Sequence, residues 1–322
     1  MMYFMRFFYS LSGYFFATSH SNTSVQMSGP GVSSVKILKY TNSVLQDQND
    51  LLVREEPLEI RLVYNDGADR KEVSVGLSMR TPGNDFELAS GLLFSEGIIT
   101  HHSEIKQIKY CEKENDNLVK VILSPDIIPD TESNQGLFHS GSACGICGKA
   151  SFEKIRNKIL RRKDEVIIKR IDWEINPDVF LSLNKALNDS QLNFRYTGGI
   201  HAAALFSQDA ELLLIREDVG RHNALDKLIG ATIHSHEINP NDCMLFLSGR
   251  AGYELIYKAI MADIRIIISI GAPSSLAVEL AQEFGICLVG FMRGNSFNVY
   301  SGFGMIEGRE IFLAEKEEHN NE

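Results

Sequence analysis

Two cysteines separated by two residues, Cys144 and Cys147, form the sharpest chemical motif of the sequence. Thiols at this spacing can bind a metal, cycle through a disulfide, or carry sulfur on a nucleophilic thiolate. Residues 133–148 around them are rich in serine and glycine, which predicts a mobile loop. A helix is expected to begin near Ala150, and its N-terminus together with Lys149 would favour the thiolate form. Local chemistry therefore favours the nucleophile.

The other two uses of the pair have less support. A structural zinc site usually takes four ligands from two such pairs, so Cys111 and His139 would have to complete this one, and we expect no metal. No thioredoxin-like pattern precedes the pair, although a redox role stays open. A zinc deaminase needs a His-x-Glu motif, whereas His201 is followed by Ala202 and Ala203, so we do not expect deamination.

A second group of candidate residues follows the apolar runs of the second half of the chain. Glycine, serine and arginine at such positions can bind phosphate, because helix N-termini attract anions and guanidinium groups donate two hydrogen bonds. The candidates of this kind are Gly198, Gly199, His201, Arg221, Arg250, Ser274, Arg293 and Asn295. Glycine and serine are also ordinary turn residues, but three arginines on three loops favour a site. No Walker motif or G-x-G-x-x-G is present.

The first half of the chain predicts a small α/β domain over residues 34–165. A strand is expected at 35–40, a hairpin at 58–79 and further strands at 105–110 and 118–123, because apolar residues alternate there. A helix is expected at 86–97 with Asp85 as its cap. A charged helix at 150–163 should follow the cysteine loop.

The second half, residues 166–314, predicts a three-layer α/β domain with a largely parallel core, because strand-like and helical runs alternate. A helix at 176–190 comes first. Strands are expected at 202–206, 211–216, 243–247, 264–270 and 287–291, and further helices at 223–235, 253–263 and 276–284. Cys243 and Cys287 lie within the apolar runs and are expected to be inert core thiols.

Composition limits the class of protein. The chain has 322 residues and a net charge of −10, which argues against binding to nucleic acid or to anionic membranes. Five cysteines are too few for a secreted disulfide framework and fit a reducing compartment. Residues 1–33 are expected to be a disordered leader, with Met27 as an alternative start, and residues 315–322 a disordered tail. No segment is long and apolar enough to span a bilayer.

Four blocks of the sequence resemble the FdhD family, the accessory sulfurtransferases of formate dehydrogenase. The blocks are Arg80-Thr81-Pro82-Gly83 through Glu96-Gly97-Ile98-Ile99, Ser142 to Lys149 around the cysteine pair, Thr197 to Ala204 continuing through Glu217 to Lys227, and Ala272-Pro273-Ser274-Ser275 through Gly290-Phe291-Met292-Arg293. The similarity extends in order over residues 35–305.

The resemblance implies a sulfurtransferase that takes persulfide sulfur from a cysteine desulfurase. The sulfur would pass to the molybdenum of the bis(molybdopterin guanine dinucleotide) cofactor, which the protein binds as a substrate and which formate dehydrogenase needs for activity. Cys144 would carry the persulfide with Cys147 as its partner. The stretch implied to bind the cofactor is Phe291, Met292, Arg293, Gly294, Asn295 and Ser296. The resemblance further implies a cytidine-deaminase-like second domain without zinc, a homodimer and a cytoplasmic location.

Two other functions stay open from the residues alone. A non-catalytic chaperone of the molybdenum cofactor would use the phosphate loops and not the thiols. A thiol–disulfide oxidoreductase would cycle the cysteine pair through an intramolecular bridge. The sequence does not name the client dehydrogenase, distinguish molybdenum from tungsten, or decide which cysteine receives sulfur first.

Overall fold

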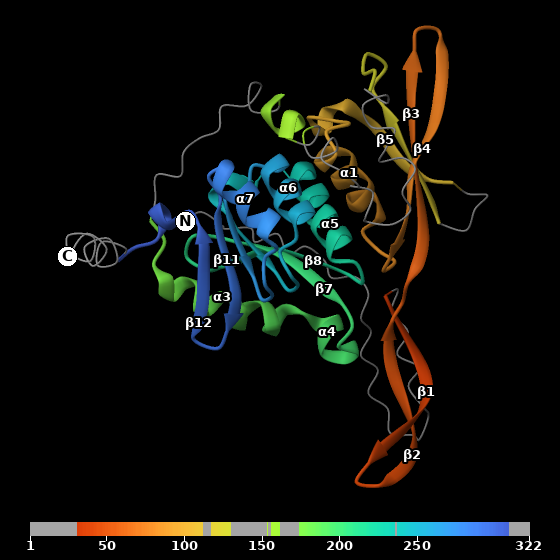
Figure 1. Ribbon diagram of the computed structural model, residues 1–322. Coiled ribbons are helices and arrows are strands. Elements are labelled where there is room, and N and C mark those ends of the chain that lie inside the picture. Colours follow the sequence, from red (N-terminus) through yellow and green to blue (C-terminus); the bar gives the residue numbers. More distant parts are fainter. Residues whose placement is uncertain are drawn as a thin grey trace, which may run out of the picture.

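The structure is a computed structural model that describes residues 31–111, 117–129, 153, 156–161, 174–235 and 237–308. Figure 1 shows three parts: a projecting two-stranded hairpin, a four-stranded sheet above it, and a larger α/β body beside both. The cysteine loop, the tail and half of the helix expected at 150–163 lie outside the described residues, and residues 153 and 156–161 are helical. Among the described helices, none is long and apolar enough to cross a membrane.

The hairpin, which we call the arm, consists of β1 (Val32–Thr41) and β2 (Val44–Val53). Asn42 and Ser43 connect the strands with φ values of 50° and 64°. Two consecutive positive φ values are typical of the tight turns that match the twist of a hairpin. β1 begins at Val32, so residues 32 and 33, which were expected to belong to a disordered leader, lie in a strand.

The four-stranded sheet has the order β4-β3-β6-β5. Its strands are β3 (Glu56–Asp66), β4 (Asp69–Arg80), β5 (Ile105–Tyr110) and β6 (Leu118–Leu123), close to the expected ranges. Leu58, Ile60 and Leu62 of β3 are at most 1% exposed, because alternate side chains of a strand share one face. That face packs on α1 (Asp85–Ser95), and the short 3-10 helix η1 (His102–Glu104) leads into β5.

The body contains a six-stranded sheet in the order β12-β11-β10-β9-β7-β8. Its strands are β7 (His201–Phe206), β8 (Leu212–Asp218), β9 (Met244–Leu247), β10 (Ile266–Ser269), β11 (Cys287–Arg293) and β12 (Ser296–Ser301). β9, β10 and β11 are parallel, whereas β7 is antiparallel to β9, β8 to β7, and β12 to β11. The expectation of an α/β fold with a parallel core is confirmed, and the parallel part is limited to three strands.

Helices cover both faces of this sheet (Figure 1). One face packs against α5 (Arg221–His234), α6 (Tyr253–Met261) and α7 (Ser275–Glu283), and the other against α3 (Pro177–Ser190), which is followed by α4 (Leu192–Thr197). The strands divide their side chains accordingly: Ala203 and Leu205 of β7 lie in the core that includes α5 to α7, whereas Ala204 and Phe206 lie in the core that includes α3. Short 3-10 helices precede β9 (η2, Pro240–Asp242) and follow β12 (η3, Phe303–Met305).

Two glycines join the first part of the chain to the body. A Cβ on Gly91 of α1 would lie 1.8 Å from the carbonyl oxygen of Asp226, and one on Gly230 of α5 would lie 1.9 Å from that of Glu87. The two helices therefore touch backbone to backbone, which only glycine permits at this distance. As a result α1 lies between the four-stranded sheet and the helices of the body.

A buried ion pair strengthens the same contact. Lys258 of α6 donates to both carboxylate oxygens of Asp226 at 2.9 and 3.0 Å and to the hydroxyl of Ser95 at 2.9 Å. Burial alone would lower the pKa of Lys258, but Asp226 and Glu96 outweigh it and raise that pKa above its usual value. The lysine therefore stays charged between α1, α5 and α6.

One expected cap is wrong. Asn84, with φ of 58°, holds the N-cap position of α1, and Asp85 is the first residue of the helix. The Asp85 carboxylate instead accepts from Nε and Nη2 of Arg80 at 3.0 and 2.9 Å. Both side chains are nearly fully buried, so the Asp85 carboxylate neutralises the Arg80 guanidinium, which also contacts Glu56 at 3.5 Å.

Candidate functional site

Most of the residues expected to bind phosphate lie along one edge of the six-stranded sheet. The parallel strands β9, β10 and β11 end there, and so does β8, because it is antiparallel to β7. β7 runs in the opposite direction, so its first residue, His201, lies at the same edge, paired with Asp218 at the end of β8. Such an edge is where open α/β sheets bind ligands. The topology thus gathers loops from all these strands.

His201 lies beside the loop that follows β9. The backbone N–H of Ala202 donates to the hydroxyl of Ser248 at 2.8 Å, and the Nδ1 atom of His201 is 3.5 Å from that hydroxyl. A Cβ on Gly249 would lie 3.3 Å from the imidazole and 3.6 Å from Cδ of Arg221. The absence of a side chain at Gly249 therefore lets His201 and Arg221 approach the same space.

Burial lowers the pKa of His201 below its usual value, and the positive charge of Arg221 and the neighbouring His222 lower it further. A neutral imidazole is therefore the dominant form at neutral pH, with one nitrogen able to accept a proton. The Nε atom of Arg221 is buried and has no hydrogen-bond partner within the part of the chain that the structure describes. A buried N–H group without an acceptor lowers the stability of the fold, so this donor favours an acceptor supplied by a ligand.

The loops after β9 and β10 are in close backbone contact. A Cβ on Gly271 would lie 2.9 Å from Cα of Arg250, and the N–H of Gly271 donates to the carbonyl oxygen of Gly249 at 3.0 Å. Arg250 itself is exposed. Ser274 is the N-cap of α7, where its hydroxyl accepts from the N–H of Ala277 at 3.2 Å. Its position at the helix start therefore has a structural reason besides any contact with a ligand.

The segment from Phe291 to Ser296 comprises the end of β11, the turn at Gly294 and Asn295, and the first residue of β12. Phe291 has φ of 53°, which is unusual for an aromatic residue, and its ring is partly exposed, with the Arg293 guanidinium 5.9 Å from its centroid. Met292 is only 1% exposed and packs in the core on the α3 side, so only its backbone can face a ligand. Gly294, Asn295 and Ser296 are exposed.

The chain matches the model of the FdhD/NarQ family over residues 53–307. It belongs to this family. A protein of Streptomyces avermitilis named "Sulfur carrier protein FdhD" is 41% identical over 274 residues, which cover 83% of this chain and 93% of that protein. A protein of the same name from Sulfurisphaera tokodaii is 39% identical over 270 residues, covering 84% and 97%.

A solved structure shares the fold. It is a protein from Desulfotalea psychrophila described as a formate dehydrogenase accessory protein, with a TM-score of 0.63 and 24% identity. The similarity covers 86% of this chain and all of that chain. The family and fold expected from the four sequence blocks are therefore confirmed.

The structure gives two of those blocks a physical role that the sequence did not suggest. Asp218 is fully buried, and its carboxylate accepts from the N–H groups of Thr81 at 3.0 Å and Gly220 at 2.8 Å. Lys227 lies 2.7 Å from the same carboxylate and donates to the carbonyl oxygen of Thr81 at 2.7 Å. The Thr81 hydroxyl accepts from the N–H of Val219. The 80–83 loop therefore holds the loop that carries Arg221.

A second group that the sequence did not reveal is the pair of His222 and Glu254. The Nε2 atom of His222, in the first turn of α5, is 3.0 Å from a carboxylate oxygen of Glu254, in the first turn of α6. The sequence offered one signal for this contact: the hydropathy pattern places both residues near the starts of neighbouring helices. The pair lies beside Arg221, which precedes His222 at the start of α5.

The cysteines fall into two groups. Cys144 and Cys147 lie outside the described residues, so their role stays a prediction. Cys243 and Cys287 are buried as expected, and burial raises the pKa of Cys243 to about 11 and that of Cys287 to about 12. Both thiols are therefore protonated at neutral pH. Cys111 is half-buried. The described residues contain no group of three or more side chains able to hold a metal.

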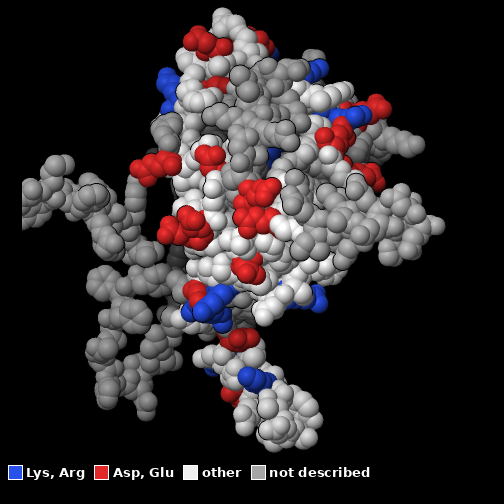
Figure 2. Space-filling view, turned by 90° about the vertical axis from the view of Figure 1, so that its left-hand side faces the viewer, with Lys and Arg blue, Asp and Glu red and all other residues white. Residues whose placement is uncertain are grey.

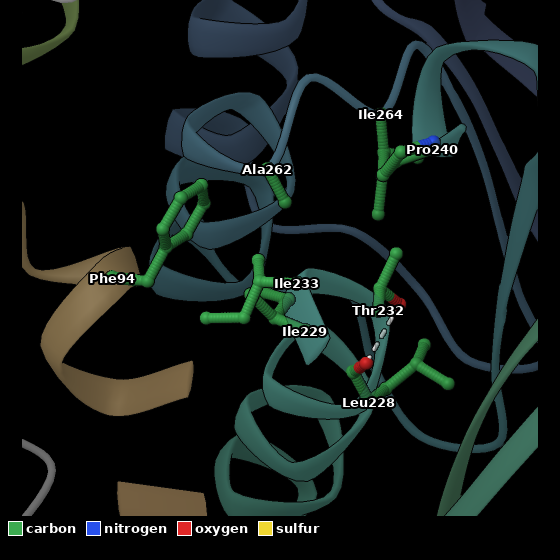
Figure 3. A pocket seen from close by; sticks show the side chains of 8 residues that line it. All are labelled: Phe94, Leu228, Ile229, Thr232, Ile233, Pro240, Ala262 and Ile264. Carbon is green, nitrogen blue, oxygen red and sulfur yellow. Dashed lines mark hydrogen bonds between the residues drawn. The ribbon is translucent and has the colours of Figure 1, made fainter. Parts of the chain in front are cut away.

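His201 is the first residue of β7, which begins after the left-handed Gly198 (φ of 63°) has ended α4. A pocket elsewhere, between the C-terminal end of α1 and helices α5 and α6, has no ionisable group (Figure 3). Its lining consists of Phe94, Leu228, Ile229, Thr232, Ile233, Pro240, Ala262 and Ile264. It is a packing gap and not a reaction site.

Proposed function

We propose that this chain is a sulfur carrier that accepts persulfide sulfur from a cysteine desulfurase on Cys144. It passes the sulfur to the molybdenum of a bis(molybdopterin guanine dinucleotide) cofactor, which it binds as a substrate and which formate dehydrogenase requires. The sulfur-carrier half of this proposal is supported by the names of the relatives in the same family. The link to formate dehydrogenase is supported by the description of the protein that shares the fold.

The proposal that the chain binds the cofactor rests on three arginines at the sheet edge that lack carboxylate partners among the described residues. Arg221, Arg250 and Arg293 have no acidic partner within the described part of the chain, whereas Arg80, Arg216 and other arginines do. In a protein of net charge −10, three guanidinium groups without carboxylates on one edge favour an anionic ligand from outside. A dinucleotide cofactor with several phosphates has that chemistry.

The sulfur chemistry balances with the two thiols alone. The Cys144 thiolate attacks the outer sulfur of the desulfurase persulfide, so that a new S–S bond forms on Cys144 and the desulfurase cysteine leaves as a thiolate. In one course the Cys147 thiolate attacks the outer sulfur of the Cys144 persulfide, so that the persulfide moves to Cys147 and Cys144 leaves as a thiolate. In the other, the Cys147 thiolate attacks the inner sulfur of the Cys144 persulfide, forms a Cys144–Cys147 disulfide and releases hydrosulfide. The two thiols then supply the two electrons that reduce the transferred sulfur.

Intact-protein mass spectrometry tests whether Cys144 accepts sulfur from a cysteine desulfurase. The chain is incubated with a cysteine desulfurase, pyridoxal phosphate and cysteine, beside the variants Cys144→Ala, Cys147→Ala and, as a matched control, Cys111→Ala. We expect a gain of one sulfur, about 32 Da, on the wild type and on Cys111→Ala and none on Cys144→Ala. A gain that persists without Cys144 would refute its role as acceptor.

Calorimetric titration with guanosine diphosphate tests whether the sheet edge binds the cofactor. Guanosine diphosphate serves as a probe for one nucleotide part of the cofactor. Arg293→Ala and Arg250→Ala should each weaken binding about tenfold, because a charged hydrogen bond contributes about 1.5 kcal/mol or more. Arg70→Ala on β4 is the matched control, since Arg70 is also exposed and outside any ion pair of the described residues. Unchanged affinity in both edge variants would refute the site. Normal binding without any persulfide would favour the cofactor chaperone instead.

A further inference from the structure

Three consecutive residues at the start of α5 make different contacts. Asn223 donates to the Asp218 carboxylate at 3.1 Å, which ties the helix start to the end of β8. The Nε2 atom of His222 lies 3.0 Å from the Glu254 carboxylate of α6. Arg221, by contrast, has a buried Nε atom without a hydrogen-bond partner among the described residues. Its two neighbours therefore leave Arg221 as the side chain of this turn that can bind a ligand.

Two carboxylates contact this helix start, and both are engaged. The Asp218 carboxylate is fully buried and is shared by Lys227, Asn223 and two backbone N–H groups. The Glu254 side chain is 25% exposed, and His222 is its one polar partner within the described part of the chain. A glutamate side chain that can move pairs readily with a nearby arginine. The contact with the imidazole therefore sets where this second carboxylate points.

The helix dipole accounts for the position of Glu254 but not for that of His222. An acidic residue is favoured in the first turn of a helix, so Glu254 suits the start of α6. A histidine gains nothing from the dipole in the first turn of α5, which has no acidic residue there and no side-chain cap on Gly220. The position of His222 is therefore explained by its contact with Glu254 and not by the stability of its own helix.

Carboxylates are abundant on the surface around this site. Figure 2 shows acidic side chains prevailing over basic ones on the face that it displays, and the whole chain has a net charge of −10. An anion reaches the sheet edge only where local positive charge outweighs this background. Arg221 and His222 both lower the pKa of His201, so the helix start acts electrostatically on the edge. A single carboxylate turned towards Arg221 would cancel the charge of its guanidinium.

On the basis of the proposed cofactor binding at the sheet edge, we propose that His222 is a positioning residue for the anion. Its imidazole holds the Glu254 carboxylate and so keeps the Arg221 guanidinium open to a phosphate group. Without the imidazole, the carboxylate pairs with Arg221 and competes with the phosphate. The fold does not depend on this contact, because Asn223 and the close packing of α5 on α1 hold the helix independently.

A clamp between the two helices would give a different pattern of variants. If the contact only fastens α5 to α6, removing either partner has the same effect, and removing both restores nothing. If His222 restrains Glu254, the loss of the imidazole is harmful only while the carboxylate is present. A double variant therefore separates the two roles.

Calorimetric titration of the full chain with guanosine diphosphate tests the proposal. His222→Ala should bind about tenfold more weakly, because Arg221 pairs with the released carboxylate. His222→Gln keeps a side-chain donor for Glu254 and should stay within about threefold of the wild type. Glu254→Gln should bind about twofold more tightly, because it removes a negative charge near the phosphate. The double variant His222→Ala/Glu254→Gln should recover the affinity that His222→Ala loses.

Glu283→Gln is the matched control for the removal of a charge. Glu283 is the last residue of α7, at the end of the helix away from the sheet edge, and it pairs with the exposed Arg156. Its replacement should leave the affinity within about twofold of the wild type, since surface charges at a distance are screened by salt. Near-ultraviolet circular dichroism of every variant shows whether the body remains folded.

The outcomes separate this role from the proposed function. A wild type that does not bind guanosine diphosphate overturns the cofactor site and the role of His222 together. If the wild type binds, the role alone is overturned by His222→Ala with wild-type affinity or by a double variant as weak as His222→Ala. If His222→Ala does not fold, Glu254→Gln decides, because weaker binding than in the wild type contradicts a carboxylate that has to be kept from Arg221.

Discussion

Replacing Lys227 by methionine should remove the contact that holds the Arg221 loop to the first part of the chain. The lysine is 1% exposed and lies 2.7 Å from the buried Asp218 carboxylate. It also donates to the carbonyl oxygens of Thr81 and Glu217. Methionine has a similar length and fills the same space, so the change removes the charge and the donors without leaving a large cavity.

The structure sets the size of the effect. Removing one partner of a buried ion pair costs about 3–5 kcal/mol, because the other charge is left without a counterion. The Asp218 carboxylate keeps three donors, the N–H groups of Thr81 and Gly220 and the Asn223 side chain. They compensate part of the loss, so we expect the lower limit, about 3 kcal/mol in the free energy of unfolding.

Urea denaturation of the wild type and the variants measures this value. Lys120→Met is the matched control, because Lys120 is 23% exposed and pairs with Glu72 at 2.7 Å on the surface; it should lose at most about 1 kcal/mol. The double variant Asp218→Asn/Lys227→Met should lose less than the sum of the two single changes, since it removes the unpaired charge. Equal losses in Lys227→Met and Lys120→Met would refute the argument.

Two further predictions follow from the packing and the histidines. Gly91→Ala would place its Cβ 1.8 Å from the Asp226 carbonyl oxygen, so it should destabilise the chain by about 2 kcal/mol or more, whereas Gly76→Ala, with open space around it, should be nearly neutral in thermal melts. Burial lowers the pKa of His201 and His234, so the unfolded chain binds protons more readily; the free energy of unfolding should be highest above pH 6.5 and fall below it. His234→Gln should reduce that fall between about pH 7.5 and 5.5, and an unchanged pH dependence would contradict it.

Hydrophobic periodicity predicted most elements of the body and of the four-stranded sheet. β5 and β6 match their expected ranges, and β3 shows the alternation that the sequence indicated. The helices after β8, β9 and β10 begin within two residues of their expected starts, because each follows a short buried strand and a turn. These are the segments where burial on one face requires a regular pattern.

The elements that the sequence did not predict lack such a pattern. β2 contains a polar run from Gln46 to Asp50 and is exposed along most of its length, so no buried face imposes alternation on it. β12 is short and only half-buried at the edge of the sheet. Asp85 was expected to cap a helix, but the buried guanidinium of Arg80, close in sequence and in space, competes more strongly for its carboxylate. At Asp85, local propensity therefore yields to a tertiary contact.

The arrangement of the edge depends on a reversal that no local pattern contains. A sheet of parallel strands would place the start of β7 opposite the ends of β9 and β10, and His201 would lie far from Arg250. Because β7 is antiparallel to β9, Ala203 pairs with Leu247 and His201 extends past the end of β9. The 80–83 loop then supports the same edge from the first part of the chain through Thr81. The candidate site therefore requires both halves of the chain, since one half supplies its loops and the other holds one of them in place.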